Sequence, residues 1–376
     1  MRRFAALLLL AALPSAAQAQ GTISTEQARI EVSTIAKGLD HPWGIAYLPD
    51  GSLLVTERSG ALRRVDERGT LGKPIKGVPE VDARGQGGLL DITLHPNFAQ
   101  NRVLFLSFSE PGEGGNSTAV ARAQLSEDHS KLNDLRVIFS QKPKLDSTKH
   151  YGSRIVFDRE GKIYVGLGER SHEQFSRQAQ DLNSHLGKVI RLNEDGSVPP
   201  DNPFVGRQDV LPEIWSYGHR NIQAAALHPA SGKFWEIEHG PKGGDEVNIP
   251  KPGKNYGWPV MSHGVNYDGT PVGIGRKDAP GMEKPIYTWT PVIAPSGMMF
   301  YSGKAFPEWK GDLFVGGLRA TALVRLELDG EKVVGEERLL RDLGYRIRDV
   351  TESPEGAIVV ITDEDNGRII RISPGD

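Results

Sequence analysis

The stretch "SRIVFDREGKIYVGLGER", Ser153–Arg170, holds two apolar runs separated by an Asp-Arg-Glu-Gly turn. Successive strand residues face opposite sides of a sheet, so alternating runs on either side of such a turn predict an antiparallel hairpin. The same order of strand, turn rich in Pro, Asp or Gly, and second strand occurs six times along the chain. The other five copies cover residues 43–66, 89–110, 222–240, 297–330 and 348–373.

The spacing of these copies favours a β-propeller. The turns of successive copies lie 47, 62, 71, 78 and 47 residues apart. The shortest steps match one four-stranded blade, and the longer ones indicate inserted loops. A β-sandwich gives no reason to repeat one unit six times. We therefore expect an all-β fold, a single six-bladed β-propeller over residues 20–376, whose last blade is closed by the N-terminal strand within "ARIEVSTIAKGL", Ala28–Leu39.

The first nineteen residues have the three parts of a secretory signal peptide. Arg2 and Arg3 precede the apolar run Phe4–Leu13, and Ala17-Gln18-Ala19 forms a small-residue cleavage site. The alternative, a buried N-terminal helix, would have no polar position on either face. No later stretch approaches the ~20 apolar residues of a membrane-spanning helix. We expect residues 1–19 to be a signal peptide, the mature chain to have no membrane span, and the protein to be periplasmic.

Composition narrows the classes of function. The chain has 45 Lys and Arg against 48 Asp and Glu, a balance that argues against a nucleic-acid partner. It has no cysteine, so no thiol can act as a nucleophile or redox centre and no disulfide can form. Stability must come from burial and backbone pairing, with bound metal as a further source.

His150 stands directly before the hairpin of the third copy, in "KHYGSRIVF". At the start of an innermost strand its ring should face the central channel of the propeller. A lone histidine in such a place is most often a structural residue. The residues that stand at matching positions in other copies favour a role as a catalytic base.

Basic residues recur beside several expected inner strands and should converge on the channel. Two explanations are open: the arginines pair with acids such as Asp349 and Glu352, or they bind a polyanion with several carboxylates through bidentate forks. The converging set comprises Arg220, Asn221, Arg319, Arg346 and Arg348.

The segment "EHGPKGGDEVN", Glu238–Asn248, combines carbonyls that glycines can turn outward with the carboxylates of Asp245 and Glu246. Calcium accepts such a mixture of oxygen ligands, although an ordinary polar turn explains the segment equally well. Dinucleotide-binding, nucleophile-elbow and zincin motifs are absent from the sequence. What remains is a histidine base, an oxygen-ligated divalent ion and an arginine-lined anion pocket.

Eight motifs together resemble the soluble quinoprotein glucose and aldose sugar dehydrogenases. They span His41 to Ser373, and include "HPWGIAYLPDG", "GQGGLLDITLHPNF", "GHRN", "NYGWP", "APSGMMFY" and "RIRDV" besides the segments quoted above. The resemblance implies a six-bladed propeller that binds pyrroloquinoline quinone (PQQ) and Ca²⁺ at one end of the channel. PQQ carries three carboxylates, which would satisfy the arginines.

The resemblance also implies roles for individual residues. His150 matches the general base, and the five residues of the converging set match cofactor-binding positions. Gly240 and Pro241 match the carbonyls that hold the catalytic calcium. The remaining matches are Asp245, Glu246 and Tyr256 for a structural calcium site, and Gln86, Tyr287 and Trp289 for the sugar pocket.

The implied reaction is oxidation of an aldose at C1 to a lactone, with an external acceptor reoxidising the cofactor. Two departures from the family pattern stand near the base: Lys149 replaces an acid, and Arg170 replaces a neutral amide expected near the sugar. They favour the broad-specificity aldose branch. Two other functions fit the same scaffold, a calcium-dependent lactonase-type hydrolase and a non-catalytic propeller that binds sugars or a partner.

Overall fold

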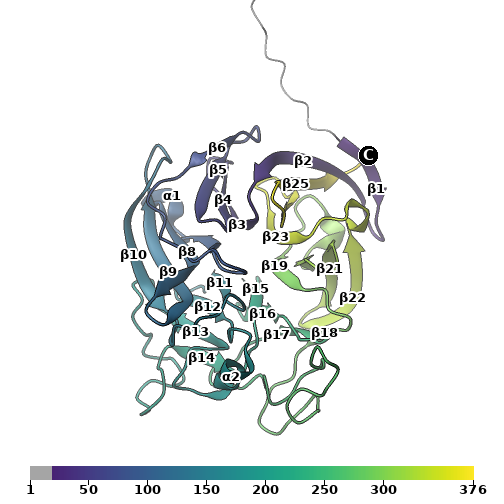
Figure 1. Cartoon of the computed structure of the whole chain (residues 1–376). Helices are drawn as coiled ribbons and strands as arrows, with labels where there is room; N and C mark the ends of the chain where they lie inside the picture. Colours follow the sequence, from purple (N-terminus) through teal and green to yellow (C-terminus); the bar gives the residue numbers. More distant parts are fainter. Residues whose placement is uncertain (1–18) are drawn as a thin grey trace, which may run out of the picture.

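The computed structural model describes residues 19–376, which form a ring of six antiparallel sheets (Figure 1). The innermost strands of neighbouring sheets pack against one another all the way round, so the ring is closed. The expected all-β, six-bladed propeller is confirmed.

Blades 1 to 3 are ordinary four-stranded units. Blade 1 contains β3 (Pro42–Tyr47), β4 (Leu53–Glu57), β5 (Ala61–Val65) and β6 (Leu71–Pro74). Blade 2 contains β7 (Leu89–Leu94), β8 (Val103–Gly112), β9 (Gly115–Leu125) and β10 (Leu132–Ser140). Blade 3 contains β11 (Gly152–Phe157), β12 (Ile163–Leu167), β13 (Lys188–Leu192) and β14 (Ile214–Tyr217).

Blades 4 and 5 keep this order, and blade 6 is larger. Blade 4 contains β15 (Ile222–Leu227), β16 (Phe234–Glu238), β17 (Asp245–Asn248) and β18 (Tyr287–Trp289). Blade 5 contains β19 (Pro295–Phe300), β20 (Leu313–Gly317), β21 (Ala322–Asp329) and β22 (Lys332–Leu339). Blade 6 contains β23 (Ile347–Glu352), β24 (Ile358–Thr362), β25 (Gly367–Pro374), β2 (Arg29–Leu39) and β1 (Ala19–Ser24).

The N-terminal strand closes the ring as expected. β2 pairs antiparallel with β25 from Ile30↔Pro374 to Leu39↔Gly367, and β1 adds a further strand outside β2. The two ends of the described chain therefore meet in one sheet (Figure 1). The predicted signal peptide lies outside the described residues except for Ala19, the first residue of β1.

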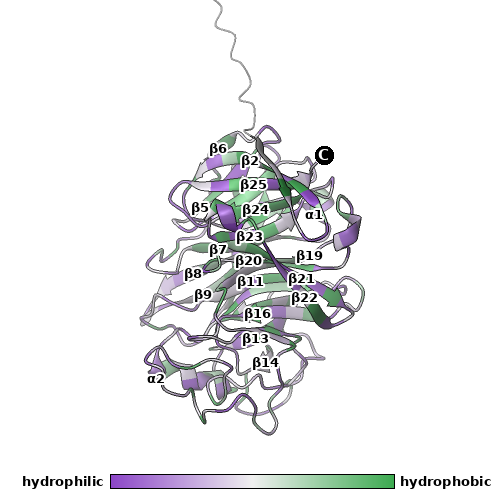
Figure 2. Ribbon diagram, turned by 90° about the vertical axis from the view of Figure 1, so that its right-hand side faces the viewer, coloured by the Kyte–Doolittle hydropathy of each residue, from purple (hydrophilic) through white to green (hydrophobic). Residues whose placement is uncertain are grey.

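The second strands lie in the middle of the apolar packing. In β4, β12, β16, β20 and β24 every residue is buried, because neighbouring blades cover both faces. This explains why sequences such as "IVVIT" in β24 are nearly continuously apolar rather than alternating. The apolar clusters join adjacent blades, as where Phe105 of blade 2 packs with Ile163 of blade 3. The edge-on view shows the hydrophobic colour following these strands (Figure 2).

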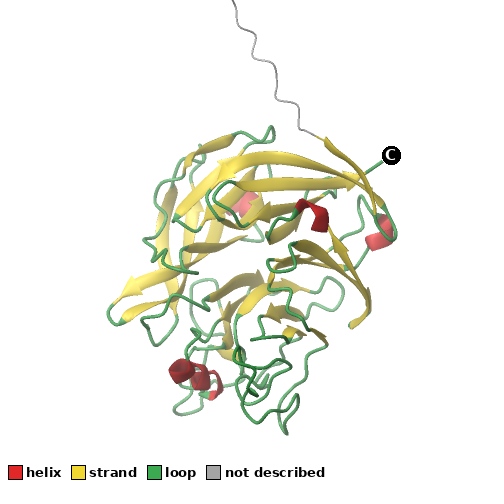
Figure 3. Ribbon diagram, turned by 45° about the vertical axis from the view of Figure 1, so that its right-hand side comes forward, coloured by secondary structure: helices red, strands yellow, loops and turns green. Residues whose placement is uncertain are grey.

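Among residues 19–376 helix is limited to short pieces in the connections between strands (Figure 3). They are α1 (Phe98–Asn101), α2 (Glu173–Ser176) and the 3₁₀ turns at Arg177–Gln180, Pro307–Trp309 and Arg341–Leu343. The longest insertion runs from residue 249 to 286, between β17 and β18. Among the described residues no helix is long and apolar enough to cross a membrane.

Each innermost strand carries an irregularity near its start. The register between first and second strands shifts at this end in all six blades, for example between Gly152 and Ile155 in blade 3. A β-bulge bends a strand and re-aims its side chains. The six bulges lie around one opening of the channel. They direct side chains toward this opening that a regular strand would direct elsewhere.

Gly297 lies at the bulge of blade 5, where Asp349 of blade 6 leaves no room for a side chain. A methyl group there would lie 1.7 Å from Oδ1 of Asp349 on blade 6. We expect Gly297→Ala to lower the free energy of unfolding by ~1–3 kcal/mol, as overpacking does in tight cores. Denaturant unfolding measures this effect. Gly335→Ala in β22, which meets only the flexible side chain of Glu327, is the control; equal effects of the two changes would contradict the prediction.

Candidate active site

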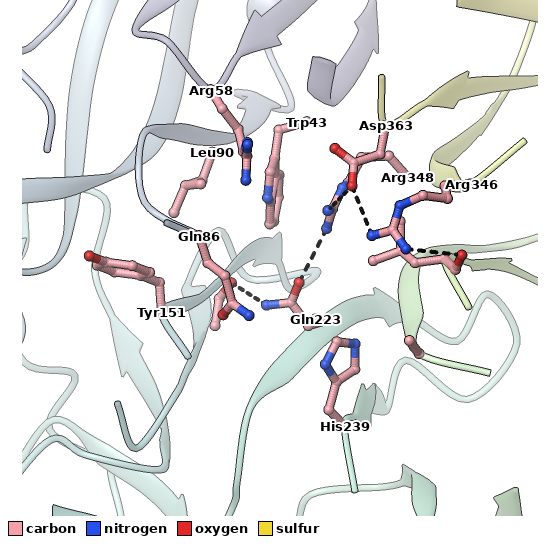
Figure 4. Close-up of a pocket in the computed structure, with 13 residues that line it drawn as sticks. Trp43, Arg58, Gln86, Leu90, Tyr151, Gln223, His239, Arg346, Arg348 and Asp363 are labelled. Atoms are coloured by element: carbon pink, nitrogen blue, oxygen red, sulfur yellow. Dashed lines mark hydrogen bonds and ion pairs between the residues drawn. The ribbon is translucent and has the colours of Figure 1, made fainter. Parts of the chain in front are cut away.

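A cavity of about 270 Å³ opens at the bulged end of the channel, and all six blades contribute to its wall (Figure 4). Its lining is unusually rich in guanidinium and amide groups. The lining residues are Trp43, Arg58, Gln86, Leu90, Tyr151, Gly152, Gln223, His239, Ala294, Leu318, Arg346, Arg348 and Asp363.

Arg154 crosses the channel below this cavity. Its Nη1 lies 3.0 Å from Oδ1 of Asp91 and 3.0 Å from Oδ2 of Asp349, and its Nε donates to the Gln223 carbonyl at 2.8 Å. The guanidinium also lies 4.2 Å from the ring centre of Trp43. Burial acts to lower the pKa of Arg154, but the two carboxylates outweigh it and raise that pKa. The cavity therefore has a charged floor in which each charge is paired.

Arg346 and Arg348 share one carboxylate in the cavity wall. Asp363 Oδ2 lies 3.1 Å from Arg346 Nη2 and 2.8 Å from Arg348 Nη2. Burial acts to raise the pKa of Asp363, but the two guanidinium charges outweigh it and hold that pKa below its usual range. Asp349 pairs with Arg154, and Glu352 bonds Ser302, so neither of the two acids expected as partners accepts these arginines. Two cations sharing one anion leave a net positive charge.

His150 is held from both sides by hydrogen bonds. Its Nδ1 lies 2.9 Å from Oε1 of Glu169, and its backbone N–H donates to Gln86 Oε1 at 2.8 Å. Its φ of 51° lies in the left-handed region, which is uncommon for a residue other than glycine. The side chain is buried just behind the lining residues Tyr151 and Gly152. Burial and the charge of Arg220 lower the pKa of His150, so its ring is neutral near pH 7.

Arg170 does not reach the cavity as a sugar contact would. Its side chain is completely buried and lies over the Tyr151 ring, 3.9 Å from the ring centre. It donates to the carbonyls of Lys149, Asn116 and Ser147 and to Asn116 Oδ1, at 2.6–3.0 Å. The expectation of Arg170 near the sugar is corrected: this residue braces the loop that presents His150.

Arg220 and Asn221 of the converging set lie next to the His150 loop. Arg220 Nη1 donates to the carbonyls of His239 at 3.1 Å and Gly240 at 2.9 Å. Asn221 Oδ1 accepts the Gly152 N–H at 3.1 Å, which ties blade 4 to the start of β11. His239 Nε2 lies 2.6 Å from the Pro295 carbonyl, and burial lowers the pKa of His239 to about 3, so this wall residue is uncharged.

The residues predicted to bind metal are close together, but three of them are engaged by other groups. Both oxygens of Asp245 accept backbone N–H groups, from Gly240 at 2.8 Å, Ile293 at 2.8 Å and Ala294 at 2.9 Å. The Tyr256 hydroxyl donates to the Ile249 carbonyl at 2.7 Å. The Gly240 carbonyl already accepts from Arg220. Gly240 and Glu246 line a void of about 10 Å³, the size of one water or ion.

The structure does not place Tyr287 and Trp289 at the cavity, where the sugar pocket was expected. They belong to β18, the outermost strand of blade 4. The Tyr287 hydroxyl and Trp289 Nε1 both donate to Glu336 Oε2 at 2.8 Å, which fastens blade 4 to blade 5. Gln86 does line the cavity. Arg319 is an exposed residue beside the lining residue Leu318 and has no ion pair among the described residues.

Sequence reasoning missed the other half of the wall. It searched the positions before first strands, whereas antiparallel pairing brings the residue after each second strand to the same end of the blade. The signal was a repeated offset: these residues follow β4, β12, β16 and β24 by one or two positions, and three of them line the cavity while Glu169 lies behind it against His150. The missed residues are Arg58, Glu169, His239 and Asp363.

Comparison with known proteins assigns this propeller and its cavity to a class of sugar-oxidising enzymes. A family model described as Glucose / Sorbosone dehydrogenase matches residues 39–371. The chain therefore belongs to the glucose/sorbosone dehydrogenase family, which confirms the resemblance drawn from its motifs.

Individual relatives agree with this family. The aldose sugar dehydrogenase YliI of Escherichia coli (strain K12) is 44% identical over 92% of this chain and 94% of its own length. Quinoprotein glucose dehydrogenase B of Acinetobacter calcoaceticus is 29% identical over 89% of this chain and 85% of its own. The solved PQQ-bound aldose sugar dehydrogenase of Streptomyces coelicolor matches with a TM-score of 0.76 at 29% identity, covering 92% of this chain and 99% of that one. The chain is an oxidoreductase of the aldose sugar dehydrogenase type.

The role of Arg170 can be tested by Arg170→Lys, which keeps the charge but cannot make four bonds from one planar group. We expect sugar oxidation to fall ~10²-fold, because small misplacements of a catalytic loop are costly. Steady-state kinetics measure this, and Arg177→Lys at an exposed site is the control. Unchanged turnover in Arg170→Lys would show that the His150 loop needs no such brace.

Proposed function

We propose that the protein is a periplasmic quinoprotein that oxidises aldoses at C1 to lactones, with PQQ and Ca²⁺ as cofactors and His150 as general base. The observation that carries this proposal is the positively charged cavity with His150 behind its wall. The names of the relatives support the choice of PQQ among possible anionic cofactors.

The residues present fit a cofactor with several carboxylates. Buried Nε atoms of Arg58, Arg220 and Arg348 have no hydrogen-bond partner among the described residues. Unpaired buried donors are rare in native proteins, and carboxylates are the natural partners of guanidinium groups. Arg346 and Arg348 would hold the cofactor from blade 6, Arg220 and Asn221 from blade 4, and Arg319 from the rim.

Calcium would be held by the backbone carbonyls of Gly240 and Pro241, because carbonyl oxygens are ligands that Ca²⁺ prefers. The turn is shaped for this: a side chain at residue 240 would lie 2.3 Å from the Gly243 carbonyl. Glu246 and Tyr256 remain proposed for a second, structural calcium. Asp245 fits that role poorly because three backbone N–H groups already occupy its carboxylate.

The chain's own contribution to the reaction is proton removal. When bound, PQQ and calcium supply a two-electron acceptor for the hydride from C1 and a Lewis acid. His150 takes the proton of the C1 hydroxyl on Nε2, because Nδ1 faces Glu169. Glu169 fixes the tautomer and stabilises the imidazolium that forms. Gln86 joins the cavity wall to the His150 backbone and is proposed to contact the sugar.

The lactonase-type hydrolase is less well supported. Such an enzyme needs a metal ion with several side-chain carboxylates at the centre of the channel. The carboxylates there, Asp91 and Asp349, are both paired with Arg154. An ion at this place would have to displace a buried guanidinium.

Reconstitution tests the function directly. Protein purified without cofactor is mixed with PQQ and Ca²⁺, singly and together, while dye reduction is followed with a panel of aldoses. We expect activity only with both additions and on several sugars. Activity with calcium alone on lactones, or no spectral change of PQQ on mixing, would contradict the proposal.

His150→Ala should lower sugar oxidation by ~10²–10⁴-fold, the usual contribution of a general base. PQQ titration, followed by absorbance, should be nearly unchanged because the arginines remain. A loss of PQQ affinity as large as the loss of turnover would place His150 in cofactor binding instead.

The pH profile reports the state of His150. A base acts unprotonated, so activity is present above its pKa and is lost as pH falls through it. Since that pKa is lowered from 6.5, the acid limb of kcat/KM should lie below pH 6.5. The charge of Glu169 raises the pKa of His150, so Glu169→Gln should move the limb to still lower pH and reduce kcat. A limb that moves to higher pH would refute the pairing.

Arg348→Met should weaken PQQ binding, because it removes a buried charge from the cavity wall. We expect a loss of ~10²-fold, the size of one charge-assisted hydrogen bond with its desolvated partner. A PQQ titration measures it, with the exposed Arg341→Met as the control. Equal affinity of the two variants would remove Arg348 from the cofactor site.

A further inference from the structure

A second group of titratable residues lies beside the cavity, buried within blade 4. His219, Glu236 and Glu238 place one ligand atom each within 4.8 Å of one another. None of the three belongs to the residues proposed above to hold calcium. His219 and Glu236 are completely shielded from solvent, and Glu238 is 4% exposed.

The strand register explains how the acids come together. Residues 236 and 238 are two apart on β16, so their side chains point to the same face of the sheet. Across from them on β17, Asn248 is paired with Glu236, and Glu246 is paired with Glu238. Three carboxylates and one amide therefore share a single face, and His219 approaches it from the turn before β15.

The hydrogen bonds within this group leave Glu236 without a donor. Both of its carboxylate oxygens, and Oδ1 of Asn248, are buried and have no hydrogen-bond partner among the described residues. His219 Nδ1 lies 3.3 Å from Glu238 Oε1 and 3.5 Å from Glu236 Oε1, so one ring N–H faces two acids. A buried carboxylate without donors is costly, and a cation would remove that cost.

We propose that His219, Glu236 and Glu238 bind one divalent transition-metal ion of the Zn²⁺ type, with Asn248 Oδ1 as a fourth ligand. An imidazole nitrogen with two carboxylates suits zinc, whereas calcium takes oxygen ligands alone. Ser216 Oγ lies 2.8 Å from His219 Nε2, the outer contact that commonly orients a metal-bound histidine. The tyrosine ring of Tyr256 stacks on His219 at 4.8 Å and covers the group.

The ion is tied to the cofactor pocket through Glu238. The second oxygen of this residue accepts the backbone N–H of Arg220, whose guanidinium donates to the Gly240 carbonyl at 2.9 Å. The ion therefore fixes the part of blade 4 that carries Arg220 and the 240–241 turn. The void that borders Glu238 is only about 10 Å³, too small for a sugar, so the function of the ion is structural.

The alternative is that protons, rather than a metal, neutralise the acids. Burial, followed by the charge of Glu238, raises the pKa of Glu236 to about 7. Burial lowers the pKa of His219, but its side-chain contacts with Glu236 and Glu238 outweigh burial and raise that pKa to about 9. The two alternatives predict opposite results for Glu236→Gln. Without a metal the change removes an unpaired buried acid and should leave stability equal or higher. With a metal it removes a ligand.

Elemental analysis of the full chain tests the proposal without PQQ or sugar, so its outcome is independent of the proposed function. The protein is refolded in Zn²⁺, Mn²⁺ or Ca²⁺ and exchanged into metal-free buffer. We expect about one retained equivalent of transition metal in the wild type and in Glu127→Gln, a control at an exposed position. Glu236→Gln should lose it. No retained transition metal in the wild type, or retention by Glu236→Gln, would overturn the site.

Thermal unfolding provides the second measurement. 1,10-Phenanthroline, which removes transition metals and does not bind Ca²⁺, should lower the melting temperature of the metal-loaded wild type, whereas its non-chelating isomer 1,7-phenanthroline should not. Glu236→Gln should melt at or above the temperature of the metal-free wild type with either isomer, and circular dichroism checks that it folds. A Glu236→Gln protein more stable than the wild type in every buffer would establish protons in place of the metal.

Discussion

The buried guanidinium of Arg154 is the interaction on which the ring depends. Blade 3 supplies it, and blades 1, 2, 4 and 6 contact it through Trp43, Asp91, the Gln223 carbonyl and Asp349. Blade 5 contributes space rather than a contact, because Gly297 has no side chain and Asp349 fills the space that it leaves. A buried ion pair is weak support for stability in general, but losing one partner leaves a buried charge unpaired. Each blade is therefore held to a position set by the others.

The cavity lies above Arg154, and its wall has more positive than negative charge. Arg154 has two carboxylate partners, whereas Arg346 and Arg348 share Asp363 alone. Burial lowers the pKa of Arg348, which shows that its surroundings provide less compensation than its charge requires. A carboxylate-bearing cofactor of the kind proposed above would supply the missing negative charge.

The fold could be predicted from sequence because one hairpin pattern recurs six times and because the apolar run at Ala28–Leu39 needs a partner. Half of the site could also be predicted, because bulged first strands present His150, Arg220 and Arg348 at one end. The residues after second strands, such as His239 and Glu169, were missed because the motifs that contain them were interpreted for other residues and the repeated offset was not used. Trp289 was misplaced because the sequence does not distinguish an aromatic residue in an outer strand from one that lines a pocket. Arg170 was misplaced because sequence spacing does not show that three carbonyls turn inward to bind it.

Blade 6 has a consequence for how the chain acquires its shape. Its strand β2 is synthesised early and its neighbour β25 last, so the seam joins the most distant parts of the described chain. Until the C-terminal segment appears, β2 is an open edge able to pair with another molecule. Such a seam delays completion and makes contacts of high sequence separation decisive for the folding rate. A chain exported across a membrane in an unfolded state would not be hindered by this late pairing. Both β2 and β25 would reach the same compartment before they pair.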